Sequence, residues 1–297
     1  MTTTSAPKNW TEQDIPDQTG RKFVVTGANS GLGEQAVRAL AKKNAQVVLA
    51  VRNIDKGKAV ADSIGSLAEV RSLDLADLSS VRTFADSIDG VDVLVNNAGL
   101  MAVPKRRTAD GFEMQFGTNH LGHFALTGLL LGRVTDRVVT LSSGAHAIGK
   151  IDLDDPNYEH RRYEAWTAYG QSKLANLMFA YELQRRLDAA GSRVKSIAAH
   201  PGYAATNLQS HTESFLDRVM AVANKVVAQS AEMGALPELY AATAPEAQGG
   251  QFIGPDKLGS MRGHPTTNGS SKRSQDVEVA GKLWDLSEKL TGVRFPV

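Results

Sequence analysis

Short apolar runs rich in β-branched residues alternate along the chain with longer segments of helical periodicity. Five of these runs predict buried strands, and two weaker runs continue the pattern. They lie at residues 23–25, 46–51, 91–95, 137–141 and 194–198, with the weaker ones at 69–73 and 251–253. Near-continuous apolar runs are typical of strands covered on both faces. The alternation therefore predicts one α/β domain with a doubly wound parallel sheet of about seven strands and helices on both faces.

Three segments interrupt this alternation with polar, turn-forming or partly amphipathic sequence. They lie at residues 144–168, 207–236 and 254–276. Long segments that follow strands commonly form lids or binding loops, and ligands of such sheets bind beyond the carboxyl ends of the strands. We therefore expect an N-terminal arm at 1–19, a main domain at 20–256 with a lid at about 207–236, and a C-terminal extension at 257–297 packed on the same domain.

The composition excludes several classes of protein. Hydrophobic residues make up 42% of the 297 residues and charged residues 22%, which suits a folded globular domain. The formal net charge of +1 provides no basic surface for nucleic acid. The absence of cysteine excludes disulfides, thiolate catalysis and thiolate metal sites. No apolar run approaches the roughly 20 residues of a membrane span, and residues 1–20 lack the apolar core of a signal peptide, so we expect a cytoplasmic protein without a membrane span.

A glycine-rich turn follows the first predicted strand and opens a helix. Its residues are Thr26, Gly27, Ala28, Asn29, Ser30, Gly31, Leu32 and Gly33. Glycines permit a tight turn and let a pyrophosphate approach the backbone, where the N-terminus of the following helix supplies N–H donors and positive potential. A plain turn is the alternative for this motif in isolation. Its position between a strand and a helix is the one that dinucleotide binding requires.

The end of the second predicted strand distinguishes the two nicotinamide cofactors. An acidic residue about 20 positions after the glycines would bind the ribose hydroxyls of NAD. Val51 stands there instead and Arg52 follows it, and a guanidinium pairs with a 2′-phosphate. We therefore predict NADP(H) in preference to NAD(H), with Ser30 as an added hydroxyl donor. A solvated Arg52 is the alternative, and Asp55 is the nearby acid that would favour NAD(H).

Two further motifs carry polar groups at a strand end and in a helix. The sequence NNAG at 96–99 follows the fourth strand, where small residues let the backbone lie against a cofactor, although an Asx turn explains it equally well. Tyr169 and Lys173 share one helix face. A unit charge about 4 Å away, at an effective dielectric near 20, contributes roughly 4 kcal/mol, enough to lower a phenol pKa of about 10 by about 3 units. In isolation, an ordinary surface Tyr and Lys would be the commoner explanation.

Taken in order, these motifs resemble the short-chain dehydrogenase/reductase family. They are TGANSGLG at 26–33, NNAG at 96–99, YGQSK at 169–173 and HPG at 200–202. The resemblance covers about residues 20–254 and implies a Rossmann-type fold. Other stretches resemble the retinol dehydrogenase-like branch, which includes the WW-domain oxidoreductases. They are NHLGHF at 119–124, LSSGAH at 141–146, YGQSKLAN at 169–176 and LWDLSEKLTG at 283–292.

The resemblance implies a catalytic tetrad of Asn119, Ser143, Tyr169 and Lys173. Tyr169 would act as general acid in reduction and as general base in oxidation. Lys173 would lower the pKa of Tyr169 and bind the nicotinamide ribose. Ser143 would hydrogen-bond the substrate carbonyl, and Asn119 would hold a water in a proton relay to Lys173.

The resemblance also implies a set of cofactor contacts, in which Asp74 would bind adenine and Thr206 the carboxamide. Asn96, Gly99, Pro201 and Gly202 would join Thr206 on the nicotinamide side. The full set is Gly27, Asn29, Ser30, Gly31, Leu32, Gly33, Arg52, Asp74, Leu75, Asn96, Ala98, Gly99, Tyr169, Lys173, Pro201, Gly202 and Thr206.

Several of these residues have structural alternatives. Ser142 and Ser143 are alternatively polar strand ends, Asp74 and Asp77 helix caps, and Pro201-Gly202 a turn. The histidines show no metal-ligand pattern and are expected to be structural, except that His146 could face substrate; they are His120, His123, His146 and His200. The basic residues at 105–107 are expected to form a solvated loop. Ser143 and Tyr169 stand farther apart than is usual in the family.

These residues together predict an NADP(H)-dependent oxidoreductase that interconverts a carbonyl and an alcohol, with 20–256 as its dinucleotide-binding catalytic domain. Apolar residues at 100–103 and 208–220 favour a lipophilic substrate. A retinoid is not implied, because the chain shows neither an apolar N-terminal anchor nor a WW module. The alternatives are a redox-silent NADP-binding sensor and a nucleotide-sugar epimerase or dehydratase. The expected partner is a small carbonyl or alcohol, and a homodimer or homotetramer is left open.

Overall fold

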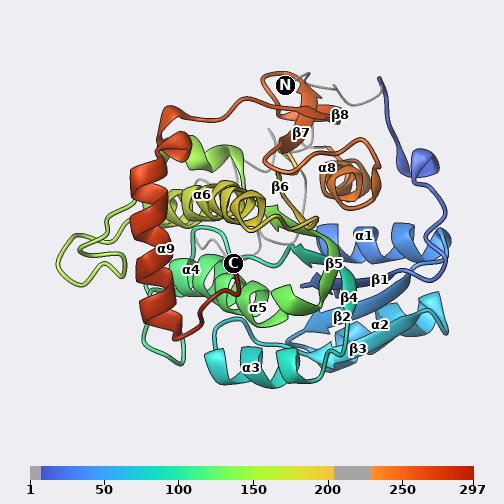
Figure 1. Ribbon diagram of the computed structural model, residues 1–297, viewed down its shortest axis with the longest axis horizontal. Coiled ribbons are helices and arrows are strands. Elements are labelled where there is room, and N and C mark those ends of the chain that lie inside the picture. The colour runs from blue at the N-terminus through green and yellow to red at the C-terminus, as the bar shows by residue number, and fades with distance from the viewer. Residues whose placement is uncertain (1–7, 204–228) are drawn as a thin grey trace.

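One eight-stranded sheet forms the centre of the computed structural model, which describes residues 8–203 and 229–297. The strands follow the order β3-β2-β1-β4-β5-β6-β7-β8 (Figure 1). Their bounds are β1 Lys22–Thr26, β2 Gln46–Val51, β3 Ala68–Ser72, β4 Val91–Asn96, β5 Val134–Leu141, β6 Lys195–Ala199, β7 Phe252–Lys257 and β8 Arg262–Thr267. The first seven are parallel, which confirms the predicted α/β fold with a doubly wound sheet.

The eighth strand lies in a segment that the sequence predicted to be irregular. β8 pairs antiparallel with β7, with Pro255 opposite Pro265. Proline interrupts a ladder of hydrogen bonds and is tolerated mainly at sheet edges. Because both paired segments contain a proline, their sequence did not predict two strands. The connecting turn has positive φ angles at Leu258, Gly259 and Ser260. The C-terminal extension therefore adds a strand to the edge of the main sheet.

Helices flank the sheet on both sides (Figure 1). The described α-helices are α1 Gly31–Lys42, α2 Ile54–Ile64, α3 Leu78–Asp86, α4 Met114–Phe116, α5 Gly122–Leu130, α6 Ala165–Ala189, α8 Ala231–Thr243 and α9 Val277–Thr291. A π-helical segment, Gly117–Leu121, joins α4 to α5. Short 3-10 helices span Glu12–Asp14, Leu131–Arg133, Gly144–Ile148 and Lys272–Gln275. Within the described ranges, no helix has the length and apolar content needed to cross a bilayer.

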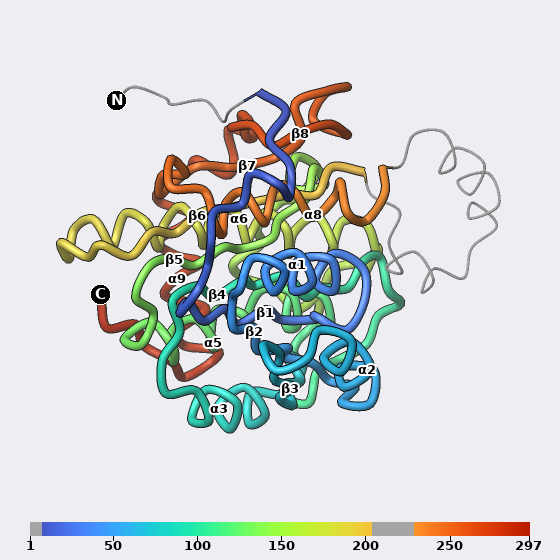
Figure 2. The backbone as a smooth tube through the Cα atoms, turned by 90° about the vertical axis from the view of Figure 1, so that its right-hand side faces the viewer, coloured from blue at the N-terminus to red at the C-terminus, as the bar shows by residue number. Residues whose placement is uncertain are grey.

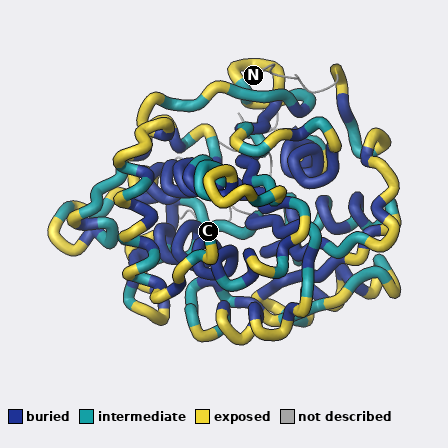
Figure 3. The backbone as a smooth tube through the Cα atoms, in the orientation of Figure 1, coloured by how far each residue is buried: buried dark blue, intermediate teal, exposed yellow. Residues whose placement is uncertain are grey.

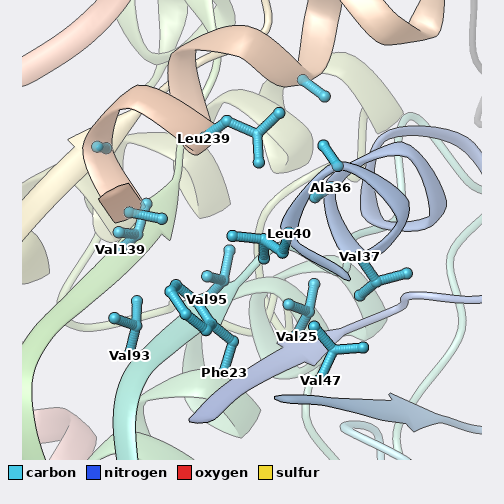
Figure 4. Close-up of a cluster of buried hydrophobic side chains, with 14 of the residues drawn as sticks. Phe23, Val25, Ala36, Val37, Leu40, Val47, Val93, Val95, Val139 and Leu239 are labelled. Atoms are coloured by element: carbon cyan, nitrogen blue, oxygen red, sulfur yellow. The ribbon is translucent and has the colours of Figure 1, made fainter. Parts of the chain in front are cut away.

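Alternate residues of each strand supply two separate apolar layers. Phe23 and Val25 face one layer, where they pack with α1 and α8, as the labelled side chains of Figure 4 show. Val24 faces the other, which contains residues of α3, α5, α6 and α9. Because successive side chains of a strand point to opposite faces, apolar residues at every position satisfy both layers at once. The continuous apolar runs in the sequence have this cause.

Both ends of the described chain pack on this framework. Trp10 is 4% exposed, its ring lies edge to face with Tyr240 of α8, and its carbonyl is hydrogen-bonded by the Nδ1 of His264. Figure 2 shows the N-terminal segment passing α8 and α1 before it enters β1. At the other end, Trp284 of α9 stacks on Phe179 of α6 at 5.8 Å. The predicted arm is therefore a packed part of the molecule from residue 8 onward.

Candidate active site

The candidate site lies beyond the carboxyl ends of β1, β4, β5 and β6, where the glycine turn, NNAG, Ser143 and the HPG sequence emerge. The strand order reverses between β1 and β4, because the chain runs outward from β1 to β3 and then returns to the other side of β1. Helices diverge at such a reversal, and ligands of open α/β sheets bind there. The fold therefore brings the predicted motifs to a single edge of the sheet.

The glycine turn has the backbone that dinucleotide binding needs. Gly27 and Gly31 have φ angles of 68° and 58°, a region that side chains disfavour. A Cβ on Gly33 would lie 2.7 Å from the Gly27 carbonyl oxygen, so only glycine lets α1 pack this closely. Ser30 is the N-cap of α1, yet its side chain makes no capping hydrogen bond. The first N–H groups of α1 therefore lack a side-chain cap, and phosphate oxygens are suitable acceptors for them.

Thr26 joins this turn to the NNAG loop. Its hydroxyl accepts hydrogen bonds from the backbone N–H groups of Asn97, at 3.0 Å, and Ala98, at 2.9 Å. The side-chain amide of Asn97 donates to the Thr26 carbonyl at 2.7 Å. Asn96 is fully buried and donates to Thr127 and Thr140, so its amide ties β4 to α5 and β5. The structure thus gives the Asn96 side chain an internal role at the strand end.

Tyr169 lies at the centre of the predicted catalytic group. It is 6% exposed, and Ser143, which follows β5, lies close enough to its phenol to act on its ionisation. Burial raises the pKa of Tyr169, while the nearby Ser143 hydroxyl acts in the opposite direction. This direction is opposite to the lowering expected from the charge of Lys173, because removal of the phenol from water dominates. The phenol is therefore protonated at neutral pH.

Lys173 lies beside the Tyr169 ring, with Nζ 5.9 Å from its centroid. Burial lowers the pKa of Lys173 to about 8, so it is mostly charged at pH 7. Nζ donates to the Leu141 carbonyl at 3.2 Å, and a Cβ on Gly99 would lie 3.3 Å from Nζ. An ammonium has three N–H donors. The side chain can therefore bind further oxygen atoms placed next to Gly99.

Asn119 completes the group from the π-helical segment. Its side chain accepts from the Leu100 N–H at 2.7 Å and donates to the Leu100 carbonyl at 2.9 Å. It also donates to the hydroxyl of Ser172 at 2.9 Å. π-helical turns are rare and occur frequently at functional sites. The structure therefore brings all four predicted catalytic residues together at one place.

Residues just before α6 and in its first turn lie beside the loop after β4 and beside Tyr169. Tyr163 donates to the Val103 carbonyl at 2.7 Å, and Gln115 links the Ala102 N–H, at 2.8 Å, to the Ala165 carbonyl, at 2.9 Å. Trp166, in the first turn of α6, is 44% exposed and lies edge to face with Tyr169 at 6.1 Å. The sequence analysis missed Tyr163, Gln115 and Trp166, because they are isolated polar or aromatic residues outside any motif.

The long segment between Ser143 and α6 is ordered by Asp155. The Asp155 carboxylate accepts from the backbone N–H groups of Glu159, His160 and Arg161 at 2.6 to 3.1 Å. The guanidinium of Arg161 stacks 3.6 Å from the Tyr158 ring centroid. Three donors to a single carboxylate hold a turn that has no regular secondary structure.

The basic residues at 105–107 are exposed, as expected of a solvated loop, and two of them make contacts across the surface. Lys105 donates to the Tyr158 carbonyl at 2.6 Å, and Arg107 pairs with Glu159 at 2.5 Å. Both contacts join the loop after β4 to the segment before α6. They depend on residues about 50 positions away in the sequence, which a local charge pattern does not indicate.

His146 supports the loop that carries Ser143. Its Nδ1 lies 2.7 Å from the Ser143 carbonyl oxygen, and its Nε2 accepts from the Ser271 N–H at 3.2 Å. The ring is 6% exposed and packs edge to face on Phe252. Both ring nitrogens are therefore engaged within the protein, and the expectation that His146 could face substrate stays a prediction. This histidine connects Ser143 to the C-terminal extension.

The Pro201-Gly202 turn follows β6, and Gly202 has a φ of 66°. Gln229 donates its side-chain amide to the Pro201 carbonyl at 2.8 Å and its backbone N–H to the Tyr203 carbonyl at 2.9 Å. Thr206 and residues 207–228 of the predicted lid lie outside the described residues. The backbone hydrogen bond from Gln229 to Tyr203 joins the two described residues on either side of this segment.

The predicted adenine-side residues lie at the ends of β2 and β3. Arg52 is exposed, and no other residue of the described chain engages its guanidinium. Asp55 is exposed in the first turn of α2, beyond the end of β2 at Val51. Asp74 accepts from the Ala76 N–H at 2.9 Å and is half-buried, while the neighbouring Leu75 is buried. No three His, Cys, Asp or Glu side chains of the described residues are placed to share a metal ion.

Comparison with known proteins agrees with this geometry. Residues 21–217 match the short chain dehydrogenase family. The chain is 39% identical over 294 residues to retinol dehydrogenase 13 of Homo sapiens, covering 93% of this chain and 86% of that protein. It is 38% identical to polyprenol dehydrogenase of Mus musculus, covering 94% of this chain and 86% of that protein.

A crystal structure of an uncharacterized protein from Mycobacterium Paratuberculosis is similar over the whole fold. It is 51% identical, with a TM-score of 0.86, and the match covers 98% of this chain and 100% of that chain. The resemblance inferred from the motifs, including the retinol dehydrogenase-like branch, is confirmed by these comparisons. With its glycine turn and its Tyr169 and Lys173 on one helix, the chain belongs to the short-chain dehydrogenase/reductase family.

Proposed function

We propose that this protein is an NADP(H)-dependent oxidoreductase that interconverts a lipophilic alcohol and its carbonyl compound. The observation that carries this proposal is the group of buried Tyr169, Lys173 and Asn119 with half-buried Ser143 next to the glycine turn. When bound, the nicotinamide supplies or accepts the hydride. The residues of the chain carry out the remaining steps. These residues bind the substrate oxygen, exclude water and transfer one proton.

The proton is held on Tyr169. Its raised pKa keeps the phenol protonated at neutral pH, which suits a general acid that donates to the oxygen of a carbonyl during reduction. Ser143, which lies near the same phenol, would donate a hydrogen bond to that substrate oxygen and orient it. In the direction of alcohol oxidation the same phenol must accept a proton, and the charge of Lys173 favours the resulting phenolate. Tyr169 and Lys173 therefore act as a pair in both directions.

The described residues fit a dinucleotide. The uncapped N-terminus of α1 would hold the pyrophosphate, and Gly27 and Gly31 allow its close approach. Lys173, which has N–H donors left beyond Leu141, would bind the nicotinamide ribose beside Gly99. Arg52, exposed at the end of β2, supports the choice of NADP(H), because a guanidinium favours the additional phosphate.

The lipophilic substrate is supported by two independent observations. Trp166 exposes 44% of its surface one helical turn before Tyr169, so an apolar group bound to the phenol would meet an aromatic wall. The relatives include proteins named retinol dehydrogenase and polyprenol dehydrogenase, and both names specify lipophilic alcohols. A polar sugar substrate would leave its hydroxyl groups without partners against this wall.

The test is the change of absorbance of the reduced nicotinamide, with each cofactor, across medium-chain aldehydes, ketones, retinal, polyprenal and sugar nucleotides. We expect turnover with NADPH and lipophilic carbonyls. The Tyr169→Phe variant should retain NADPH binding and lose about 100- to 10,000-fold in kcat, because it lacks the proton donor. The matched control is Tyr181→Phe, on the same helix. Near-normal turnover by Tyr169→Phe would exclude the catalytic assignment, whereas binding of NADPH without turnover of any carbonyl would favour a sensor.

A further inference from the structure

A chain of hydrogen bonds runs through His123, which no step above uses. His123 is 1% exposed, in the first turn of α5. Its Nε2 lies 2.9 Å from the Thr26 hydroxyl, at the end of β1. Its Nδ1 lies 2.9 Å from the backbone carbonyl oxygen of Asn119. The imidazole therefore spans the gap between the glycine turn and the π-helical segment.

The donors and acceptors around Thr26 determine which nitrogen carries the proton. A hydroxyl has two lone pairs and one proton. The N–H groups of Asn97 and Ala98 both donate to the Thr26 oxygen. The hydroxyl proton can be donated to the Nε2 of His123, 2.9 Å away, or to the Val95 carbonyl, 3.4 Å away, and the nearer Nε2 is the better acceptor. The Asn119 carbonyl beside Nδ1 can only accept, which requires the same assignment. The proton of the neutral ring must then be on Nδ1, which donates to the Asn119 carbonyl.

His123 stays in this neutral form throughout the working pH range. Burial, together with the positive charge of Lys173, lowers the pKa of His123 to about 4. If the ring were protonated, Nε2 would also carry a proton. The Nε2–H group and the Thr26 O–H group would then both be donors, and their hydrogen bond would be lost. The contact is therefore a permanent feature at neutral pH and does not act as a switch.

Asn119 is held through both its backbone carbonyl and its side chain. Its carbonyl oxygen accepts from His123, and its side chain binds both backbone groups of Leu100 and the hydroxyl of Ser172. Leu100 follows Gly99, beside which Lys173 lies, and Ser172 precedes Lys173 on α6. A shift of Asn119 would therefore move the loop and the helix that together locate the ammonium.

We propose that His123 is a positioning residue, which holds Asn119 in register with the junction of Thr26 and the NNAG loop and thereby locates Lys173 relative to Tyr169 and the cofactor. This inference rests on the proposed function, since it concerns the placement of the same catalytic group. His123 touches neither substrate nor cofactor in this role. Its effect should appear in the rate of reaction and in the ionisation of Tyr169, and less in cofactor binding.

Two conservative variants each keep one of the two His123 hydrogen bonds, to Asn119 or to Thr26, and remove the other. The amide of Asn reaches about as far as the Nδ1 of histidine, so His123→Asn can still donate to the Asn119 carbonyl. The amide of Gln reaches about as far as Nε2, so His123→Gln can still accept from Thr26 but leaves Asn119 free. In His123→Asn the Thr26 hydroxyl can turn to the Val95 carbonyl, 3.4 Å away. His123→Leu removes both contacts at similar volume.

The first measurement needs no substrate. Tyr169 ionisation is followed by tyrosinate absorbance in complex with NADP⁺, with the Tyr169→Phe protein as the blank. A displacement of the Lys173 charge from about 4 Å to about 6 Å should raise the apparent pKa of Tyr169 by about one unit at an effective dielectric near 20. We expect this shift in His123→Leu and His123→Gln, and a shift below about 0.3 units in His123→Asn.

The second measurement is steady-state kinetics with NADPH and the best carbonyl of the panel above. A misplacement of about 1 Å can cost on the order of 100-fold in rate. We expect kcat to fall about 10- to 100-fold in His123→Leu and His123→Gln, with the KM for NADPH changed less than about 3-fold. His123→Asn should keep kcat within about 3-fold of the parent. Thermal unfolding of each variant establishes that the fold is retained.

Two results would overturn the proposal. One is normal kcat and normal Tyr169 ionisation in all the variants that fold. The other is an equal loss in His123→Asn and His123→Gln that follows their loss of stability, which would make His123 a structural residue only. The Asn and Gln variants decide between these cases even where His123→Leu does not fold. If the proposed function itself is wrong, either Tyr169→Phe retains activity or the parent protein turns over no carbonyl, and both outcomes are separate from these two results.

Discussion

Burial is the main influence on the two titratable residues at the centre of the site. It raises the pKa of Tyr169 and lowers the pKa of Lys173 to about 8, because a low dielectric disfavours the charged form of each. The site is therefore arranged with a neutral phenol and a cation that has few partners within the described chain. Both properties fit the reduction of a carbonyl, which needs a proton donor next to a group that stabilises the phenolate left behind.

Cofactor choice should depend on one exposed side chain. Charged hydrogen bonds contribute about 1.5 to 3 kcal/mol, so Arg52→Gln should weaken NADP(H) binding about 10- to 100-fold. NAD(H) binding should change less than about 2-fold, because its ribose carries no phosphate. Quenching of intrinsic fluorescence during titration with each cofactor measures the affinities.

Lys58→Gln is the matched control for this prediction. Lys58 is exposed on α2, a few residues after Arg52, and the substitution removes the same charge. It should leave the ratio of the two affinities unchanged. Equal weakening of both cofactors by Arg52→Gln, or stronger binding of NADH than NADPH by the parent protein, would contradict the assignment of NADP(H).

At the scale of elements, the segment between Ser143 and α6 positions one side of the site. Glu164 caps α6 by accepting from the Trp166 and Thr167 N–H groups, at 3.1 and 2.7 Å. The segment before it is held by the Asp155 carboxylate, and it contacts the loop after β4 through Lys105. The position of Trp166 over Tyr169 therefore depends on interactions that begin about 10 residues earlier in the chain.

Asp155→Ala should disorder this segment. It leaves three backbone N–H groups without their acceptor, which we expect to cost about 1 to 3 kcal/mol in the free energy of unfolding. Faster amide hydrogen exchange at 155–164 and a raised KM for the carbonyl should accompany it. Asp154→Ala, an exposed neighbour, is the control and should change neither. Unchanged exchange in Asp155→Ala would show that the segment is held by other contacts.

At the scale of the whole molecule, α8 is enclosed on all sides. From Gly234 to Thr243 every residue is buried, and Figure 3 shows its coil in dark blue. The helix packs against α1, β8 and the N-terminal segment that carries Trp10. Both chain ends therefore contribute to the environment of this helix. Within this helix, the carboxyl oxygens of Glu238 have no hydrogen-bond partner among the residues that the structure describes, and burial raises the pKa of Glu238 to about 8.

Glu238 should make the stability of the protein fall as pH rises. The folded pKa is above the ordinary value of 4.5, so the proton is bound more tightly in the folded state. The contribution is fully present below about pH 4.5 and is lost as pH rises to about 8. Glu238→Gln should therefore gain stability relative to the parent, by about 2 to 4 kcal/mol more at pH 8 than at about pH 5.

Urea unfolding at a series of pH values measures this difference. Glu232→Gln, on the exposed first turn of the same helix, is the control and should show no pH-dependent gain. A constant difference between Glu238→Gln and the parent across this range would mean that Glu238 is solvated and ionised in the folded protein.

The sequence by itself determined the parallel strands, the glycine turn and the catalytic pair. Strand runs such as residues 46–51 are apolar at successive positions because both faces are covered, and this pattern is local. The glycine turn requires positive φ at Gly27 and Gly31, and few residues other than glycine permit it. Tyr169 and Lys173 share a helix face by their spacing alone.

Only the tertiary structure decided the features that depend on distant contacts. β8 pairs across two prolines, Trp10 is buried by a helix more than 200 residues later, and Lys105 meets the Tyr158 carbonyl. The raised pKa of Tyr169 and the tautomer of His123 also arise from burial and from partners on other elements. Local sequence constrains the backbone of each element, whereas burial and hydrogen-bond partners are set by the packing of elements that are far apart in the chain.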